Sequence, residues 1–288
     1  MRSAPLSDRT TTVDGVTVPR FLYGTAWKEE DTQRLTELAL EQGFRGIDTA
    51  NQRRHYHEAA VGQAIRASID RGTVTRDDLF VQTKFTFRAG QDHRLPYDPA
   101  EPIGVQVNQS FESSLEHLGL RAIDSYVLHG PTRSVGLAAV DWEAWRAMEA
   151  IHENGRTRLL GVSNVGLDQL QMLCNEARVR PHFVQNRCFA LQGWDRDVRR
   201  FCTDNGIVYQ GFSLLTANRP AFSRPELAEI ANRHGRTASQ TIFRFALDVG
   251  MIPLTGTTSA EHMREDLDVF SFGLTADEVA QIENILTR

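Results

Sequence analysis

The chain has 288 residues, of which 41% are hydrophobic and 24% charged, as expected for a globular protein that buries a large core. The net charge of −5 argues against nucleic acid or an anionic membrane as the main partner. Cys174, Cys188 and Cys202 lack the spacing of a zinc site or a redox pair, so we expect reduced cysteines, no metal and a cytoplasmic protein.

The N-terminal segment, residues 1–12, lacks the apolar core of a signal peptide, and no apolar run approaches membrane-spanning length. Residues 13–18 alternate around an Asp-Gly pair, which predicts a small β-hairpin. Short apolar runs and segments of helical spacing then alternate to the end of the chain. The expected strands are 21–23, 44–47, 79–84, 123–129, 158–162, 183–185, 207–212 and 251–254. The expected helices are 31–42, 58–68, 104–118, 142–153, 167–177, 195–205, 226–234, 239–247, 261–270 and 276–286.

Eight strand–helix units with no Gly/Ser linker between them favour one (β/α)8 TIM barrel, an α/β fold, over an open sheet. The first strand is not followed by Gly-x-Gly-x-x-Gly, so the fingerprint of a Rossmann domain is missing. We therefore expect a single domain over residues 1–288, with an N-terminal β-hairpin and extra C-terminal helices.

Polar residues end the second, third and fourth expected strands: Asp48, Lys84 and His129. In an α/β barrel these ends meet at one mouth, and the loop carrying Tyr56 opens there too. Taken singly, Asp48 could cap a helix, Lys84 could be a surface cation and His129 a loop histidine. Together they predict a proton donor, because a nearby cation lowers the pKa of a phenol and a carboxylate can position that cation.

Four segments, in order, resemble the aldo-keto reductases: Gly43-Phe-Arg-Gly-Ile-Asp-Thr-Ala50, Val81-Gln-Thr-Lys84, Asp124-Ser-Tyr-Val-Leu-His129 and Gly161-Val-Ser-Asn164. The resemblance covers nearly the whole chain. It implies a nicotinamide cofactor lying across the barrel mouth and reduction of an aldehyde or ketone carbonyl. In that mechanism Tyr56 gives the proton, Lys84 paired to Asp48 lowers the pKa of the phenol, and His129 orients the carbonyl.

The resemblance also implies the cofactor contacts. Ser163, Asn164 and Gln185 would bond the carboxamide, Phe212 would stack on the nicotinamide ring, and Ser213 and Leu215 would line the pyrophosphate. The segment Thr255-Gly256-Thr257-Thr258-Ser259 would hold the adenosine 2′-phosphate at a helix N-terminus. The remaining expected cofactor residues are Gly24, Thr25, Asp48, His262 and Asp266.

Three departures from the family pattern leave alternatives open. The loop after Asp48 is about two residues longer than usual, so spacing alone puts His55 near the tyrosine position. Pro253-Leu254-Thr255 lacks the usual phosphate-binding lysine, so NADPH is expected but NADH stays open. Gly130 stands where the family usually has Trp, which predicts a wider substrate pocket.

Further expectations concern the surroundings of the site. Trp27, Phe85, Phe87 and Trp194 are candidate pocket walls, whereas Tyr126 fits the core better. The basic loop residues Arg53, Arg54 and His57 fit a solvated surface better than an anion site. The segment 91–101 reads as a long loop that could act as a lid.

Two other functions stay open: a lyase using Lys84 as a Schiff base, and a non-catalytic cofactor-binding sensor or subunit. The expected partner is a small carbonyl compound, with no nucleic acid and no membrane; the sequence leaves the oligomeric state open.

Overall fold

The structure is a computed structural model that describes residues 9–287. Most of the segment considered for a signal peptide, residues 1–8, lies outside the described residues. Within the described range no helix is both long and apolar enough to cross a membrane.

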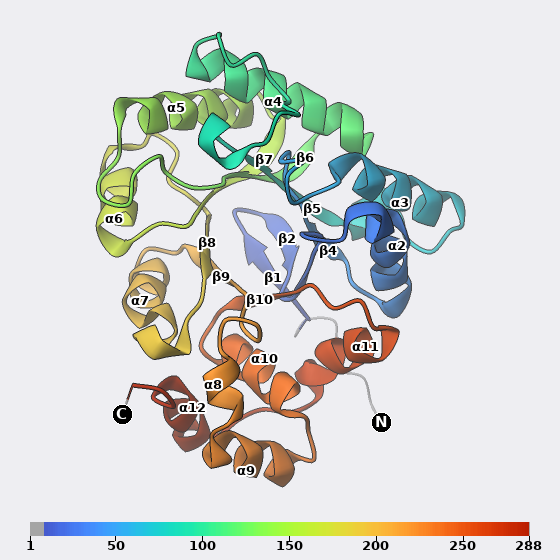
Figure 1. Ribbon diagram of the computed structural model, residues 1–288, viewed down its shortest axis with the longest axis vertical. Coiled ribbons are helices and arrows are strands. Elements are labelled where there is room, and N and C mark those ends of the chain that lie inside the picture. Colours follow the sequence, from blue (N-terminus) through green and yellow to red (C-terminus); the bar gives the residue numbers. More distant parts are fainter. Residues whose placement is uncertain (1–8, 288) are drawn as a thin grey trace.

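Eight parallel strands form a closed barrel, in which β10 pairs with both β9 and β3 (Figure 1). Each strand is short and mostly buried, as parallel strands covered by helices are. The strands are β3 (Leu22–Gly24), β4 (Gly46–Asp48), β5 (Phe80–Phe85), β6 (Ile123–Leu128), β7 (Thr157–Ser163), β8 (Phe183–Arg187), β9 (Val208–Phe212) and β10 (Ile252–Thr255). The predicted barrel is confirmed.

Helices surround the barrel and cover its strands (Figure 1). Their apolar faces pack on one continuous core, which explains the helical spacing seen in the sequence. The helices are α2 (Thr32–Gln42), α3 (Glu58–Asp70), α4 (Ile103–Leu118), α5 (Ala139–Glu153), α6 (Leu167–Glu176), α7 (Arg196–Asp204), α8 (Arg219–Phe222), α9 (Pro225–His234), α10 (Ala238–Asp248), α11 (Ala260–Asp268) and α12 (Ala276–Glu283).

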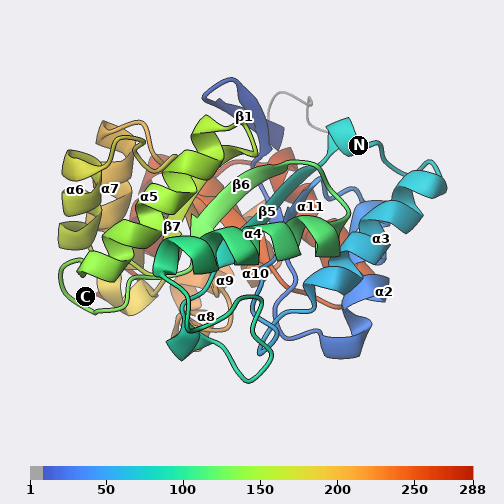
Figure 2. The ribbon, with the colours of Figure 1, turned by 90° about the horizontal axis from the view of Figure 1, so that it is seen from above.

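The predicted hairpin is also confirmed, as β1 (Thr10–Val13) and β2 (Val16–Pro19). Its turn is left-handed at both central residues, with φ of 43° at Asp14 and 74° at Gly15, the geometry that Asp-Gly favours. Val13 and Val18 pack on residues near the starts of several barrel strands, such as Leu22. The hairpin therefore covers the N-terminal end of the barrel and leaves the other end free (Figure 2).

The segment before α7 differs from the prediction. Residues 190–195 form a short 3-10 segment whose last three residues, Gly193, Trp194 and Asp195, are in left-handed conformation, so α7 begins at Arg196 rather than at Asp195. Trp194 is fully buried, and its Nε1 donates to the Ile282 carbonyl at 2.9 Å. Trp194 thus anchors the C-terminal part of the chain.

Candidate active site

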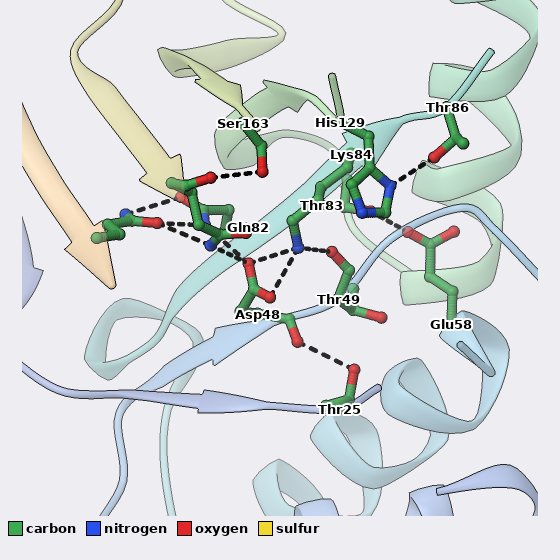
Figure 3. Close-up of polar contacts among 12 residues, drawn as sticks. Thr25, Asp48, Thr49, Glu58, Gln82, Thr83, Lys84, Thr86, His129 and Ser163 are labelled. Carbon is green, nitrogen blue, oxygen red and sulfur yellow. Dashed lines mark hydrogen bonds and ion pairs between the residues drawn. The ribbon is translucent and has the colours of Figure 1, made fainter. Parts of the chain in front are cut away.

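The four predicted catalytic residues come together at the C-terminal end of the barrel. Asp48 is the last residue of β4, Lys84 lies in β5, and His129 directly follows β6. Lys84 Nζ is 2.7 Å from each carboxylate oxygen of Asp48 and donates to the Thr49 carbonyl at 2.8 Å (Figure 3). The ammonium group is therefore fully bonded and buried, with its charge balanced by Asp48.

The phenol of Tyr56 lies above this ion pair. Lys84 Nζ is 5.3 Å from the centre of the Tyr56 ring, and the ring centres of Tyr56 and His129 are 6.0 Å apart. The neighbouring His55 instead stacks on Trp27, with ring centres 4.0 Å apart, and its carbonyl accepts from the Trp27 N–H at 2.8 Å. Of the two candidates left by loop length, only the phenol lies in ring contact with both Lys84 and His129.

The electrostatics of Tyr56 differ from the expectation. Burial raises the pKa of the phenol well above its usual value, and the negative charge of Asp48 raises the pKa further. The expected lowering by Lys84 is wrong for this structure, because the charge of Lys84 is compensated by Asp48. Burial also lowers the pKa of Lys84 itself, with Asp48 opposing that change. Tyr56 is thus firmly protonated.

His129 is held as a neutral ring. Burial is the main cause that lowers its pKa to about 3, and the positive charge of Lys84 and the nearby His55 add to it. The His129 Nδ1 atom lies 2.7 Å from Thr86 Oγ1 (Figure 3). When Thr86 donates this bond, the single proton of the neutral ring is on Nε2.

A cavity of 850 Å³ opens from Tyr56 and His129 toward the N-terminus of α11. Most of the expected cofactor residues line it, from the ends of β3, β4, β7, β8, β9 and β10 and from α11. They are Gly24, Asp48, Ser163, Gln185, Phe212, Ser213, Leu215, Thr255, Gly256, Thr257, Thr258, His262 and Asp266.

Three expected cofactor residues do not line this cavity: Ser259, which caps α11, and Thr25 and Asn164, which lie beside Asp48 and His129. Thr25 is buried and donates to the Asp48 carbonyl at 3.0 Å from both its N–H and its hydroxyl. Asn164, with φ of 55°, donates from Nδ2 to the His129 carbonyl at 2.8 Å and to Ser163 Oγ at 3.0 Å. Both side chains hold catalytic-site backbone in place.

The far end of the cavity is the N-terminus of α11. Ser259 caps the helix by accepting from the His262 N–H at 3.4 Å, and the Thr257 hydroxyl accepts from the Ser259 N–H at 3.2 Å. Helix N-termini favour anions because their first N–H groups have no helical partner. Asp266, in the second turn of α11, is buried, and this burial raises its pKa to about 7.

Sequence reasoning missed several residues that line the cavity, above all Lys28. This side chain is 7% exposed, and its Nζ donates to the Gly256 carbonyl at 2.7 Å. Burial lowers the pKa of Lys28 to about 8. Its signal was its place just after the first barrel strand, at the same edge as Asp48. The others are Ala26, Arg187, Leu214, Thr216, Thr237, Ser239, Phe243, Leu254 and Glu265.

Of the candidate pocket walls, only Trp27 lines the cavity, at its mouth and 70% exposed. Phe85, Phe87 and Trp194 belong to the core or pack on it, and Tyr126 is a core residue, as expected. Arg53, Arg54 and His57 do not line the cavity either, and Arg53 pairs with Glu30 at 3.6 Å.

The long loop of residues 91–101 is fastened to the barrel. Gln91 donates to the Asn51 carbonyl at 2.8 Å, and the buried Tyr97 donates from its hydroxyl to the Thr86 carbonyl at 2.8 Å. None of its residues lines the cavity, and these contacts hold the loop against Asn51 and Thr86 of the barrel.

Comparison with known proteins gives a family that fits this site. The model of the Aldo/keto reductase family matches residues 21–287. The chain belongs to the aldo-keto reductase family. It is 30% identical to an uncharacterized oxidoreductase, YtbE, of Bacillus subtilis over 96% of this chain and 92% of that protein.

Two solved aldo-keto reductase structures share the fold over nearly the full chain. The Bombyx mori aldo-keto reductase AKR2E4, solved in complex with NADP, superposes with a TM-score of 0.82 at 27% identity, covering 99% of this chain and 94% of that one. An aldo/keto reductase from Brucella melitensis superposes with a TM-score of 0.80 at 27% identity, covering 98% and 99%. As an aldo-keto reductase the chain is an oxidoreductase. The Schiff-base alternative also conflicts with the geometry, because Lys84 Nζ is buried and bonded to three oxygens.

Proposed function

We propose that this aldo-keto reductase uses NADPH to reduce the carbonyl group of a small aldehyde or ketone, with Tyr56 as the proton donor. The observation that carries the proposal is the placement of a buried phenol 5.3 Å from Lys84 Nζ, beside a neutral His129, at one end of a long cavity. The other end of that cavity is a helix N-terminus suited to phosphate.

The residues of the cavity fit a dinucleotide. Its volume of 850 Å³ lies in the range of cofactor sites. Phe212 offers a flat apolar face for the nicotinamide ring, and Gln185 an amide for the carboxamide. The first turn of α11 would hold the adenosine 2′-phosphate. Lys28 supplies a buried cation near Gly256, which partly replaces the lysine missing from the Pro-Leu-Thr segment.

When bound, NADPH supplies the hydride for the carbonyl carbon. Negative charge then develops on the carbonyl oxygen, and Tyr56 donates its proton there. The raised pKa of Tyr56 keeps the proton in place until the oxygen becomes basic enough to take it. His129, neutral and protonated on Nε2 when Thr86 donates to Nδ1, gives a hydrogen bond to the same oxygen and orients it.

The test is cofactor binding and turnover in three proteins: the unchanged chain, Tyr56→Phe and His55→Ala. Binding of NADPH and NADH is followed by quenching of intrinsic tryptophan fluorescence, and turnover by loss of NADPH absorbance with a panel of aromatic and aliphatic aldehydes. We expect NADPH binding in all three, and a turnover loss of about 10²–10⁴-fold in Tyr56→Phe alone, because general acid catalysis contributes about that much.

Other outcomes would separate the alternatives. If turnover were lost in His55→Ala but kept in Tyr56→Phe, the proton donor would be the histidine. Tighter binding of NADH than of NADPH would contradict the assignment of the α11 end to a 2′-phosphate. Cofactor binding without turnover on any carbonyl of the panel would favour the non-catalytic sensor.

A further inference from the structure

Three glutamines fill one layer of the barrel interior beneath the active site. Gln82 on β5, Gln185 on β8 and Gln210 on β9 have exposed fractions of 0%, 3% and 0%. In the strand registers Asp48 pairs with Gln82 and Gln185 pairs with Gln210, and hydrogen bonds across the barrel bring the two pairs together. Barrel interiors are mostly packed with branched apolar side chains, and a buried amide is costly unless it is hydrogen-bonded.

The three amides and the carboxylate of Asp48 form a closed network, which we call the glutamine ring. Gln82 Nε2 donates to Asp48 Oδ1 and to Gln210 Oε1, each at 2.8 Å (Figure 3 shows Gln82 beside Asp48). Gln185 Nε2 donates to the same two atoms, at 3.0 and 2.9 Å. Gln210 Nε2 donates back to Gln82 Oε1 at 3.1 Å. The Gln82–Gln210 bonds cross the barrel, since β5 and β9 are not neighbours.

The charge of Asp48 determines the direction of every bond in the glutamine ring. An ionised carboxylate only accepts, so Gln82 and Gln185 must turn their Nε2 atoms toward it. Their second N–H groups then require an acceptor between them, and this position is filled by Gln210 Oε1. Gln210 in turn points its own Nε2 at Gln82 Oε1. No amide can flip without placing two donors or two acceptors against each other.

One consequence reaches the cavity. Gln185 is the one glutamine of the ring that lines the cavity, and its two N–H groups are both used inside the ring. The polar atom that it has left to offer is Oε1, an acceptor. A carboxamide NH2 is a matching donor, whereas a ketone or an ester in its place has no N–H to give.

We infer that Gln82 and Gln210, which do not line the cavity, are positioning residues that act with Asp48 to fix Gln185 as a hydrogen-bond acceptor and thereby select a carboxamide on the cofactor. This inference rests on the proposed function, because it assigns the Tyr56 end of the cavity to the nicotinamide. It adds two residues from the barrel interior to the determinants of cofactor recognition.

The test compares two cofactors that differ only at this group: NADPH and its reduced 3-acetylpyridine analogue, in which a methyl group replaces the amide NH2. Dissociation constants are measured by tryptophan fluorescence. The unchanged protein should bind the analogue about tenfold more weakly, the effect of one lost hydrogen bond at a buried acceptor. In Gln210→Met, which keeps side-chain length, Gln185 keeps its bond to Asp48, but its second N–H group loses its acceptor. That N–H can then turn toward the cavity and bond the carbonyl oxygen of either cofactor, so the ratio should fall to about one to two.

Two further variants make the test specific. Gln82→Met removes the acceptor that orients Gln210 and should lower the ratio too; it also serves if Gln210→Met does not fold. Gln106→Met is the matched control: Gln106 is 5% exposed and donates to the Glu101 carbonyl at 2.7 Å, but it lies on α4 outside the cavity. It loses a buried amide bond of the same kind and should keep the wild-type ratio.

The outcomes distinguish this inference from the proposed function. If the unchanged protein binds NADPH and discriminates, but Gln210→Met and Gln82→Met keep the same ratio, the ring is merely structural and the inference is overturned while the function stands. Equal binding of NADPH and the analogue by the unchanged protein would overturn the acceptor role of Gln185. If the unchanged protein does not bind NADPH, the proposed function fails, and the inference fails with it.

Discussion

A single carboxylate orders the interior of this site. Asp48 Oδ1 accepts from Lys84, Gln82 and Gln185, at 2.7, 2.8 and 3.0 Å, while Oδ2 accepts a further bond from Lys84. Asp48 is 3% exposed, so these donors replace the water it would bind in the unfolded chain. The same charge that balances Lys84 also raises the pKa of Tyr56. One residue thus sets the position of a cation, the protonation of a phenol and the direction of an amide.

A second carboxyl group, Asp266, gives a prediction on stability. Burial raises its pKa from 3.8 to about 7, while Thr255 and His262 oppose the rise and Glu265 adds to it. Because this pKa is higher in the folded than in the unfolded protein, protonated Asp266 stabilises the fold. This contribution to the free energy of unfolding is fully present below pH 3.8 and is lost as the pH rises to about 7. In Asp266→Asn this loss is absent. The stability advantage of Asp266→Asn over the unchanged protein should grow by about 2–3 kcal/mol between pH 5 and pH 8.

Urea unfolding at pH 5, 6, 7 and 8 would measure this difference. The stability difference between the two proteins should stop growing near pH 7, because above this pH Asp266 is ionised in both the folded and the unfolded chain. A difference between the two proteins that is constant from pH 5 to pH 8 would mean that Asp266 titrates normally in the fold. Asp277→Asn, at an exposed acid in the first turn of α12, serves as the control for the loss of a carboxylate at the surface.

At the scale of elements, α3 carries Tyr56 at its entrance and must sit close to the barrel and to α4. Glu58 in its first turn accepts from the Thr83 hydroxyl, next to Lys84, and its other oxygen is 3.1 Å from His117 Nδ1 on α4. Where α3 crosses the end of α4, the close approach depends on Gly62. A Cβ atom at Gly62 would lie 2.0 Å from the His117 carbonyl oxygen, which is backbone and cannot move aside.

This contact predicts that Gly62→Ala destabilises the fold by about 1–3 kcal/mol, as overpacked positions do. Gly104→Ala on α4 is the matched control, because the nearest atoms to its added methyl group are side-chain atoms at 3.8 and 3.9 Å. That change should be neutral or stabilise by up to about 1 kcal/mol, since alanine favours helix. Urea unfolding of both variants tests the pair. If the two variants had the same free energy of unfolding, α3 and α4 would be able to move apart at Gly62 without destabilising the fold.

At the scale of the whole molecule, the cavity joins parts of the chain that are far apart in sequence. Lys28 after β3 reaches Gly256 before α11 at 2.7 Å, a separation of 228 residues. Tyr23 in β3 also donates from its hydroxyl to the Thr257 carbonyl at 3.0 Å. Because β3 and β10 are the strands whose pairing closes the barrel, the phosphate end of the cavity lies over that closure.

A ligand that spans the cavity should therefore stabilise the whole barrel. At a concentration of 100 times its Kd, NADPH should contribute about 2.7 kcal/mol and raise Tm by about 5 °C. Nicotinamide mononucleotide and adenosine 2′,5′-bisphosphate, at the same concentration as NADPH, each reach only one end and should give smaller shifts. Differential scanning fluorimetry measures all three. A shift with the bisphosphate as large as that with NADPH would show that the Tyr56 end adds nothing to cofactor binding.

Much of this protein could be predicted from its sequence. Strand and helix periodicity gave the eight units, and Asp48, Lys84 and His129 could be assigned to one mouth because the C-terminal ends of barrel strands converge. The segment Gly161-Val-Ser-Asn164 and the three other segments that resemble the aldo-keto reductases indicated the family to which the chain belongs. These features are short sequence patterns, so they can be recognised without knowing which residues are in contact in the folded protein.

Contacts between distant segments decided the rest. Loop length left His55 and Tyr56 as rivals; the stacking of His55 on Trp27 and of Tyr56 over Lys84 separated them. The pKa of Tyr56 depends on its burial and on the charge of Asp48, which is paired with Lys84. Neither the burial nor the ion pair can be derived from the sequence alone. Gln82 and Gln210 look like ordinary strand residues until barrel closure brings them within hydrogen-bond distance of each other. The sequence by itself determined the barrel and its reactive edge, because both follow from short-range periodicity; only the tertiary structure decided which groups on that edge share a charge or a proton.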